Sequence, residues 1–180
     1  MLQRGRIVSW SASLFLFCTH LSSQTDIPHL KYGNTMPSIA GQALSGNWIE
    51  LPAATQGKAA AVLFSFSRAA GHDAQNWTQH LSNDDPRLPI YTVIFLESVP
   101  RLLRGMVISG IKSGMPTGMQ DRTILLFRDE LSWKRRFRLS DESHACVILI
   151  RPNGEIQWIS PESFTDARYS ELTKEIQALK

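Results

Sequence analysis

The sequence predicts an α/β fold in which a central mixed sheet carries helices on both faces. Continuous apolar runs, which are typical of strands buried on both faces, occur at residues 59–67, 88–98, 123–127 and 144–151. The segments after the first two runs have apolar residues at helical spacing. With 180 residues, the chain is long enough for one domain with its own core and short for two.

The first half of the chain predicts an irregular start followed by a strand, a helix and a strand. Pro, Gly, Ser and Asn punctuate residues 25–58, where NWIELP alone indicates a short hairpin or edge strand. The run at 59–67 is a central strand. A helix is expected over about 70–81, because its apolar residues recur at spacings of three and four. The run at 88–98 is the second buried strand.

The second half predicts helices and strands that close the sheet with a hairpin. In order, we expect a helix weakened by two glycines, a strand, a short polar helix or turn, and two strands joined by PNG: residues 101–115, 123–127, 129–137, 144–151 and 155–160. Ser163 with Asp166 is expected to cap a terminal helix. That helix carries an apolar stripe made of Tyr169, Leu172, Ile176 and Leu179.

Residues 1–24 have the pattern of a secretory signal peptide: MLQRGR is basic, a short apolar stretch follows, and the exit is polar. We expect cleavage, which leaves residues 25–58 as a loop and hairpin extension and residues 59–180 as the core. The bacterial periplasm is the expected location. An uncleaved membrane anchor and mitochondrial targeting are the alternatives, and a lipid anchor at Cys18 is disfavoured because small residues do not precede it.

Charge argues against a nucleic-acid partner. The leader holds two of the 19 basic residues and none of the 16 acidic ones, so the remainder has a net charge of +1. One basic cluster, KRRFR at residues 134–138, is typical of a solvated face. Membrane contact is therefore expected only through an uncleaved leader.

Two phrases, taken in order, resemble the thioredoxin-like superfamily in its TlpA and peroxiredoxin-like branch. MPSIAGQALSGNWIELPAATQGKAAAVLFSFS is similar to the opening hairpin and first buried strand of that branch. ACVILIRPNGEIQW is similar to its late hairpin. The resemblance covers about residues 36–180 and implies a thioredoxin-like α/β sandwich.

Two families within this superfamily look closest, and both lack the redox cysteines. LSDESHACVILIRPNGEIQWISPESFTDARYSEL is similar to the C-terminal block of the periplasmic YtfJ family. A strand-to-tryptophan hairpin is shared, more weakly, with the mitochondrial ATP synthase assembly chaperone family. The first resemblance agrees with an export signal, and the second would imply assistance in assembling a membrane complex.

The resemblance implies a former active-site corner that has lost its sulfur chemistry. Redox-active members carry Cys-x-x-Cys at a helix N-terminus, where the helix dipole favours a thiolate. Counting from the strand places Ala70-Gly71-His72-Asp73 at those four positions, after Arg68. Ala145 stands where the family has a cis-proline, so a trans peptide is expected there.

Other chemistries at this corner have weaker support in the sequence. His72 is a candidate acid or base, and with Asp73 and His144 it is a candidate metal ligand, but no fixed spacing supports a site. We favour a structural interpretation, in which Asp73 stabilises the first helical turn. Neither a metal nor a cofactor is expected.

Cys146 is the one cysteine that follows the leader, so an internal disulfide is not expected. It precedes the apolar run VILI, which favours a buried and inert thiol. A reactive thiol is the alternative, because the adjacent loop faces the former corner.

Tryptophans are the remaining candidates for a partner surface. Packing in the core and hairpin accounts for Trp77 and Trp158. Trp133 lies among basic residues, so Trp133, Arg135 and Arg136 are the expected interface.

The sequence favours a binding or assembly factor of the cell envelope over an enzyme. A protein or peptide partner is expected, bound by strand addition to the late edge strand beside the corner. The alternative is a thiol-disulfide or peroxide oxidoreductase that uses Cys146 alone. A structural domain with neither role is a third interpretation.

Overall fold

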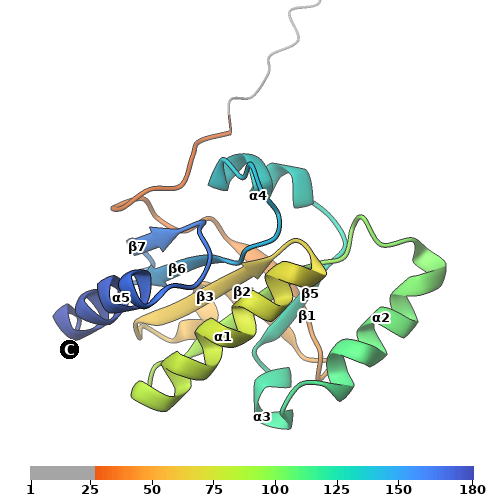
Figure 1. Cartoon of the computed structure of the whole chain (residues 1–180), viewed down its shortest axis with the longest axis horizontal. Helices are drawn as coiled ribbons and strands as arrows, with labels where there is room; N and C mark the ends of the chain where they lie inside the picture. The colour runs from red at the N-terminus through yellow and green to blue at the C-terminus, as the bar shows by residue number, and fades with distance from the viewer. Residues whose placement is uncertain (1–26) are drawn as a thin grey trace, which may run out of the picture.

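A seven-stranded mixed sheet forms the centre of the structure, a computed structural model that describes residues 27–180 (Figure 1). The predictions for residues 1–24 lie outside this range. The strand order is β2-β1-β5-β4-β3-β6-β7. Strands β3, β4 and β5 run parallel, and all other neighbours are antiparallel. The strands are β1 Ile39–Ala43, β2 Trp48–Leu51, β3 Ala60–Ser65, β4 Ile90–Phe95, β5 Thr123–Leu126, β6 Cys146–Ile150 and β7 Ile156–Ser160.

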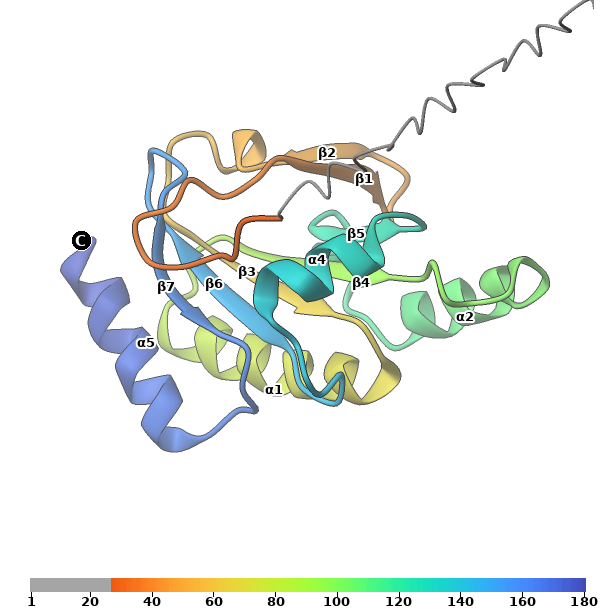
Figure 2. The same ribbon diagram turned by 90° about the horizontal axis from the view of Figure 1, so that it is seen from above.

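Helices cover both faces of the sheet, as predicted. Helices α1, α2 and α5 pack on one face, and α4 packs with the segment before β1 on the other (Figure 2). The bounds are α1 Arg68–Asp84, α2 Arg101–Ser113, α3 Thr117–Gln120, α4 Glu130–Phe137 and α5 Asp166–Ala178, with a 3₁₀ turn at Ala53–Thr55. Within residues 27–180, every helix is too short or too polar to span a bilayer.

The core has two layers because β3 and β6 are buried along their whole lengths. On the α4 side, aromatic side chains dominate, and the rings of Phe66 and Phe95 stack 4.6 Å apart. On the α1 side, Trp77 is fully buried against the hairpin and α5, 6.0 Å from the ring of Trp158. The predicted packing roles of both tryptophans are confirmed.

The sequence pattern missed β1. This strand pairs with β2 in the expected hairpin and joins the sheet by pairing Gln42 with Leu125 of β5. Its small residues gave no apolar alternation. The close approach requires them, because a Cβ at Gly41 would lie 2.7 Å from a methyl carbon of Ile124. The four-residue helix α3 was also not predicted.

Two helix starts differ from the prediction because other residues cap them. Helix α1 begins at Arg68 rather than near residue 70, since the Ser67 hydroxyl accepts a hydrogen bond from the Ala70 amide at 3.1 Å. The proposed Ser163 cap of the last helix is wrong. Thr165 is the N-cap there, and its hydroxyl accepts from the amide of Arg168 at 3.2 Å.

Candidate functional site

The loops that follow β3, β4 and β5 meet at one edge of the sheet, where α/β folds usually bind ligands. Ser67 lies at this corner, directly before α1. Its hydroxyl donates to the carbonyl of Glu142 at 2.6 Å in addition to capping the helix. The corner therefore joins the start of α1 to the loop before β6 through one serine.

The four positions assigned to the former redox motif lie further along the helix than expected. Since α1 begins at Arg68, its N-terminus is formed by residues 67–70, and Asp73 belongs to the second turn. Ala70 is buried, Gly71 is half-buried, and the side chains of Arg68 and His72 are exposed. A cysteine is absent from residues 67–73 under either alignment.

Asp73 ties α1 to two other segments rather than stabilising the first turn. Its carboxylate accepts hydrogen bonds from the amides of Ala145 and Phe164, each at 3.0 Å. The first bond requires an amide hydrogen that a proline would lack. The His144–Ala145 peptide is trans, as predicted. The expectation that Asp73 stabilises the first turn is wrong because Ser67 starts the helix earlier.

The proposed metal ligands do not converge. His72 points to solvent, and both carboxylate oxygens of Asp73 are used by backbone amides. The His144 ring lies instead 3.4 Å from the carboxylate of Asp141. In residues 27–180, no three His, Cys, Asp or Glu side chains are grouped to hold a metal ion. The described chain therefore does not bring the three candidate ligands together.

The loop before β6 brings together a serine, a histidine and an aspartate, but not in the arrangement of a catalytic triad. These residues are Ser143, His144 and Asp141. The Ser143 hydroxyl and the Asp141 carboxylate both approach Nε2 of His144, at 3.2 and 3.4 Å. A nucleophilic triad needs the acid on the opposite ring nitrogen. Ser143 donates to Asp141 at 2.6 Å, and hydrogen bonds from Ser143 hold the Asp141 pKa below its usual value. The set is a loop-stabilising turn.

Cys146 is completely buried, as the sequence favoured. It opens β6 opposite Phe64 and has no exposed surface. Burial, followed by the nearby charge of Asp73, raises the pKa of its thiol to about 12. The thiolate, which is the nucleophilic form, is therefore scarce at neutral pH.

Trp133 does not form a partner surface, which corrects the prediction. It is 5% exposed, and its ring stacks on Phe64 at 5.1 Å in the aromatic layer under α4. The Arg136 guanidinium lies 5.7 Å from the Trp133 ring. Arg135 is exposed, but the segment before β1 crosses this helix.

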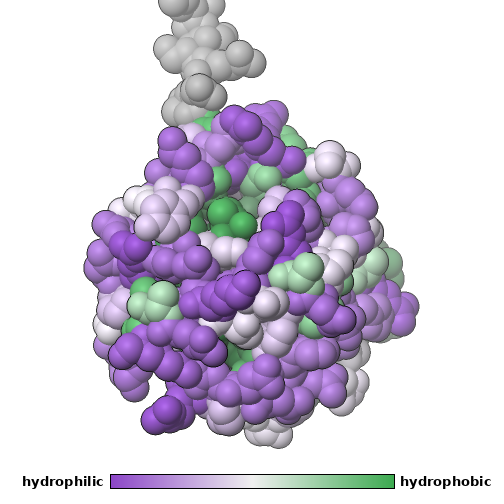
Figure 3. Space-filling model, turned by 60° about the vertical axis from the view of Figure 1, so that its left-hand side comes forward, coloured by the Kyte–Doolittle hydropathy of each residue, from purple (hydrophilic) through white to green (hydrophobic). Residues whose placement is uncertain are grey.

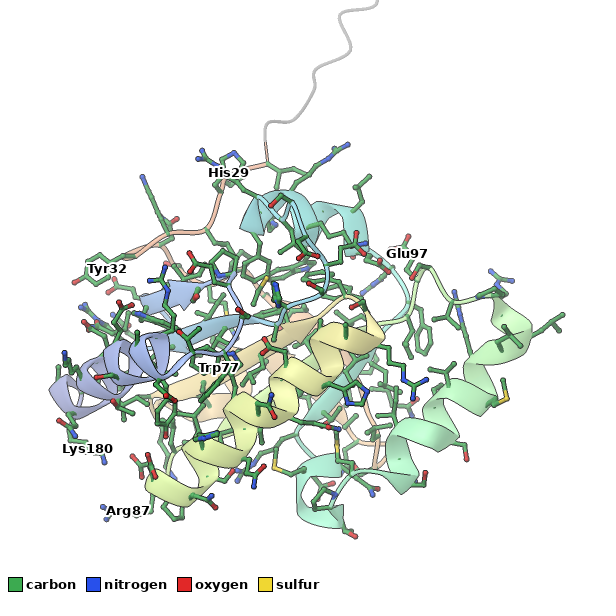
Figure 4. All side chains as sticks on the ribbon, viewed as in Figure 1. His29, Tyr32, Trp77, Arg87, Glu97 and Lys180 are labelled. Atoms are coloured by element: carbon green, nitrogen blue, oxygen red, sulfur yellow. The ribbon has the colours of Figure 1, made fainter. Side chains whose placement is uncertain are left out.

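That segment binds the end of α4 through its backbone. The amide of Leu30 donates to the carbonyl of Arg136 at 2.9 Å, and the His29 ring lies 3.0 Å from the carbonyl of Arg135. Figure 4 shows His29 beside α4. The basic cluster is thus partly occupied by the chain's own N-terminal segment.

The sequence reasoning missed a charged network at the corner. Lys134 Nζ lies 2.7 Å from a carboxylate oxygen of both Glu130 and Glu142. Burial alone would lower the pKa of Lys134, but hydrogen bonds to the two glutamates outweigh it, so the pKa is raised. Glu130 is 5% exposed and accepts from the amide of Ser98. The sequence could have indicated this ion pair, because Glu130 and Lys134 are four residues apart in a predicted helix, a spacing at which opposite charges pair.

Glu97 extends this network toward α2. Its carboxylate accepts from the backbone amide of Glu130 at 2.8 Å, so it serves the start of α4. Figure 4 shows Glu97 between α4 and α2. Every charged group in the network has a partner, which indicates a structural connection between the loops of the corner.

The outer edge of β7 is half covered. The segment before β1 pairs with its beginning: the amide of Gly33 donates to the Ile156 carbonyl, and the Ile156 amide donates to Asn34. Along residues 157–160, no other strand of the described chain pairs with this outer edge of β7. Since Ser160 pairs with Val147, the open half lies beside the loop that leads into β6. The open edge and the corner are therefore neighbours.

Open hollows on the described surface lie away from the corner. The face turned forward in Figure 3 is mostly hydrophilic, with small apolar spots. Two open hollows lie elsewhere, one of about 330 Å³ between α1 and α5 and one of about 270 Å³ between α2 and the β1–β2 turn. The first contains the ion pair of Lys180 with Asp85, and the Tyr169 hydroxyl donates to Asp84 at 2.7 Å.

Solved structures with similar folds are thioredoxin-like proteins. A thioredoxin domain of a thiol-disulfide oxidoreductase from Bacteroides vulgatus matches with TM-score 0.59 and 22% identity over 81% of this chain and 97% of that chain. An exposed lipoprotein thioredoxin from Streptococcus pneumoniae gives 0.57 and 12%, over 77% and 99%. A thiol peroxidase from Chromobacterium violaceum gives 0.53 and 12%, over 83% and 89%.

The remaining comparisons give no match: no family model and no curated protein sequence resembles the chain. The identities to the solved structures are below 25%, so these similarities concern the fold. Together with the seven-stranded mixed sheet and its helices on both faces, they show that this chain has the thioredoxin-like α/β fold.

Proposed function

We propose that this chain is a thioredoxin-like binding or assembly factor of the cell envelope that works without thiol chemistry. It holds an extended segment of a protein partner against the open half of the β7 edge, beside Ser67 and the start of α1. The observation that carries the proposal is this half-open edge next to the corner.

Strand addition suits such a site because it needs only backbone groups of the host strand. The corner is also held rigidly, since Asp73 fixes the loop before β6 and Ser67 fixes the same loop from the other side. A rigid edge costs less entropy on binding than a mobile one. Arg68, exposed at the first position of α1, supplies a positive charge beside the bound segment.

Export is part of the proposal and is supported by the pattern of residues 1–24 and by one neighbour whose name describes an exposed lipoprotein. The more specific resemblance to the periplasmic YtfJ family also favours this location. The ATP synthase assembly chaperone family remains the weaker relative.

An oxidoreductase is the second candidate, because the named neighbours include thiol-disulfide enzymes and a thiol peroxidase. The complete burial of Cys146 and its thiol pKa of about 12 argue against that role. We therefore rank it below binding.

A photo-crosslinking experiment tests the binding site. Benzoylphenylalanine is placed at Arg68, at Pro161 just after β7, and at Trp48 on the opposite sheet edge, a matched exposed control. In an envelope extract, the first two positions should capture the same protein and the third should not. Equal capture from all three positions, or capture of unrelated proteins by the first two, contradicts the site.

Insulin reduction and peroxide consumption test the enzymatic alternative. We expect the wild type and Cys146→Ala to be equally inactive in both assays. Activity that disappears in Cys146→Ala would replace the proposal with the oxidoreductase.

A further inference from the structure

Helix α2 is the most exposed element of the domain. None of its 13 residues is buried, and it contacts the body through half-buried side chains such as Val107, Ile108 and Ile111. On its outer side, Leu102 is 97% exposed, Met106 is 69% exposed and Leu103 is 46% exposed. Exposed apolar side chains that form a contiguous patch often mark a surface that contacts a protein or a membrane.

The helix lies at one end of the molecule. Figures 1 and 2 both place α2 at the end opposite α5, outside the main body of the sheet. The exposed side chains of Leu102, Leu103 and Met106 therefore lie at one end of the molecule, on the side of α2 away from the body. A projecting apolar helix suits a broad, deformable surface better than a narrow segment of another chain.

Charge at this end has one sign along the helix. Residues 99–120 contain Arg101, Arg104 and Lys112 and no acidic residue. Arg104 holds the first turn in place: it donates to the Val99 carbonyl at 2.9 Å, and its guanidinium lies 4.9 Å from the ring of Phe127.

Phe127 extends the apolar end of α2. It is 39% exposed, and Arg128 follows it with 73% of its side chain exposed. Two exposed acids, Glu97 and Asp129, lie near this end and keep their negative charges. Four cations, Arg101, Arg104, Lys112 and Arg128, outnumber them, so the end has a net positive charge. Positive charge beside exposed leucine and methionine is the composition of a helix that lies in the interface of an anionic bilayer.

We propose that α2 docks the domain on an anionic lipid surface, with Leu102 and Met106 entering the interface and Arg101, Lys112 and Arg128 pairing with lipid phosphates. This goes beyond the proposed function, because it uses a different end of the molecule from β7 and involves no protein partner. Docking would hold the domain beside the bilayer independently of residues 1–24.

A site-specific probe tests this in the full chain. Cys18→Ala removes the other cysteine of the sequence, and Cys146 has no exposed surface, so a cysteine placed at Leu102 or at Trp48 is the one that reacts with an NBD fluorophore. Trp48, 69% exposed on β2, is the matched control. Phosphatidylglycerol–phosphatidylcholine vesicles should raise NBD emission at position 102 by about twofold or more, with a blue shift. Emission at position 48 should not change.

Vesicle composition and salt concentration distinguish the electrostatic part of the binding from the apolar part. Pure phosphatidylcholine vesicles, or about 0.5 M salt, should largely abolish the rise at position 102, because salt screens exposed charges. Vesicle sedimentation of Leu102→Ser/Met106→Ser and of Arg101→Gln/Lys112→Gln should show about tenfold weaker binding than Trp48→Ser. All substituted residues are at the surface, so folding is checked by circular dichroism.

Two outcomes overturn the inference. A silent probe at position 102 while the chain still sediments with vesicles would assign binding to another part of the chain. NBD emission that rises when another protein is added, but not when vesicles are added, would assign the end of α2 to a protein partner. Emission that rises with the concentration of this chain, without vesicles, would assign it to a second copy.

Discussion

Two side chains at the corner define its chemistry: the half-buried Asp73, whose carboxylate binds backbone amides, and the fully buried Cys146. Asp73 uses both carboxylate oxygens on backbone amides, and Cys146 is sealed in β6 beside it. The negative charge of Asp73 adds to burial in keeping the Cys146 thiol protonated.

Cys146 should therefore be unreactive until the chain unfolds. Its thiol pKa is raised from 9.0 to about 12, so the thiolate fraction stays small through pH 9 and grows only as the pH approaches 12. In a Cys18→Ala background, Ellman's reagent should label no thiol at pH 8 and one thiol in denaturant. Stoichiometric labelling of the native protein at pH 8 would contradict the buried thiol.

Asp73→Asn should destabilise the protein. An amide offers one acceptor oxygen in place of two, so the amide of Ala145 or of Phe164 loses its partner, at a cost of about 1–3 kcal/mol. Urea unfolding measures the loss. His72→Asn, at the exposed neighbouring position, is the control and should change the free energy of unfolding by less than about 0.5 kcal/mol.

At the scale of elements, Lys134 links helix α4 to the loop before β6. Lys134 connects Glu130 on its own helix to Glu142 on the loop before β6. That loop is also held by Ser67, so α1, α4 and the start of β6 form one connected unit.

Lys134→Met should uncouple this unit. It leaves the buried carboxylate of Glu130 without its cation, and we expect a loss of about 2 kcal/mol or more in unfolding free energy. Because the Lys134 pKa is raised above 10.5, the stabilisation is complete below that pH and is lost as the pH rises through the folded-state pKa.

Chemical unfolding at pH 7 and at pH 11 measures this difference, which should shrink at the higher pH. Arg135→Met, on the exposed side of the same helix, is the control and should have little effect at either pH. An equal loss from both substitutions would mean that the ion pairs do not hold α4.

At the scale of the whole molecule, the segment before β1 closes the fold. It contacts the end of α4 through Leu30, covers the start of β7 through Gly33 and Asn34, and buries Met36 in the α4-side core at 1% exposure. This segment therefore joins α4, the start of β7 and the α4-side core.

Met36→Ala should test how strongly this closure supports the domain. A cavity at a fully buried methionine costs about 2–4 kcal/mol. Thermal or urea unfolding measures the loss. Met106→Ala is the matched control, because that side chain is 69% exposed on α2 and should give a change below about 0.5 kcal/mol.

The fold was largely predictable, because β3 and β6 have continuous apolar sequences that only a doubly covered strand buries. Strand β1 was expected only through the resemblance, as one half of the opening hairpin. Its residue pattern gave no strand signal, since its small residues are required by close contact with β5. Trp133 was misassigned although Phe137 follows four residues later, a spacing that marks one buried helix face.

The candidate site was predicted less well than the fold. The absence of cysteine at the corner is visible in the sequence, but the partners of Asp73 are backbone amides 72 and 91 residues away. Backbone groups carry no sequence signal, so only the folded chain reveals them.

The short covering of β7 by residues 33–35 sets a length limit. In the proposed binding mode, a partner strand that enters from the corner meets the chain's own N-terminal segment at Ile156, after the four host residues 157–160. If strand addition occurs as proposed, residues 33–35 would stop a long partner strand and leave room for a short one. The N-terminal segment would therefore select partners by the length of strand that they present to β7.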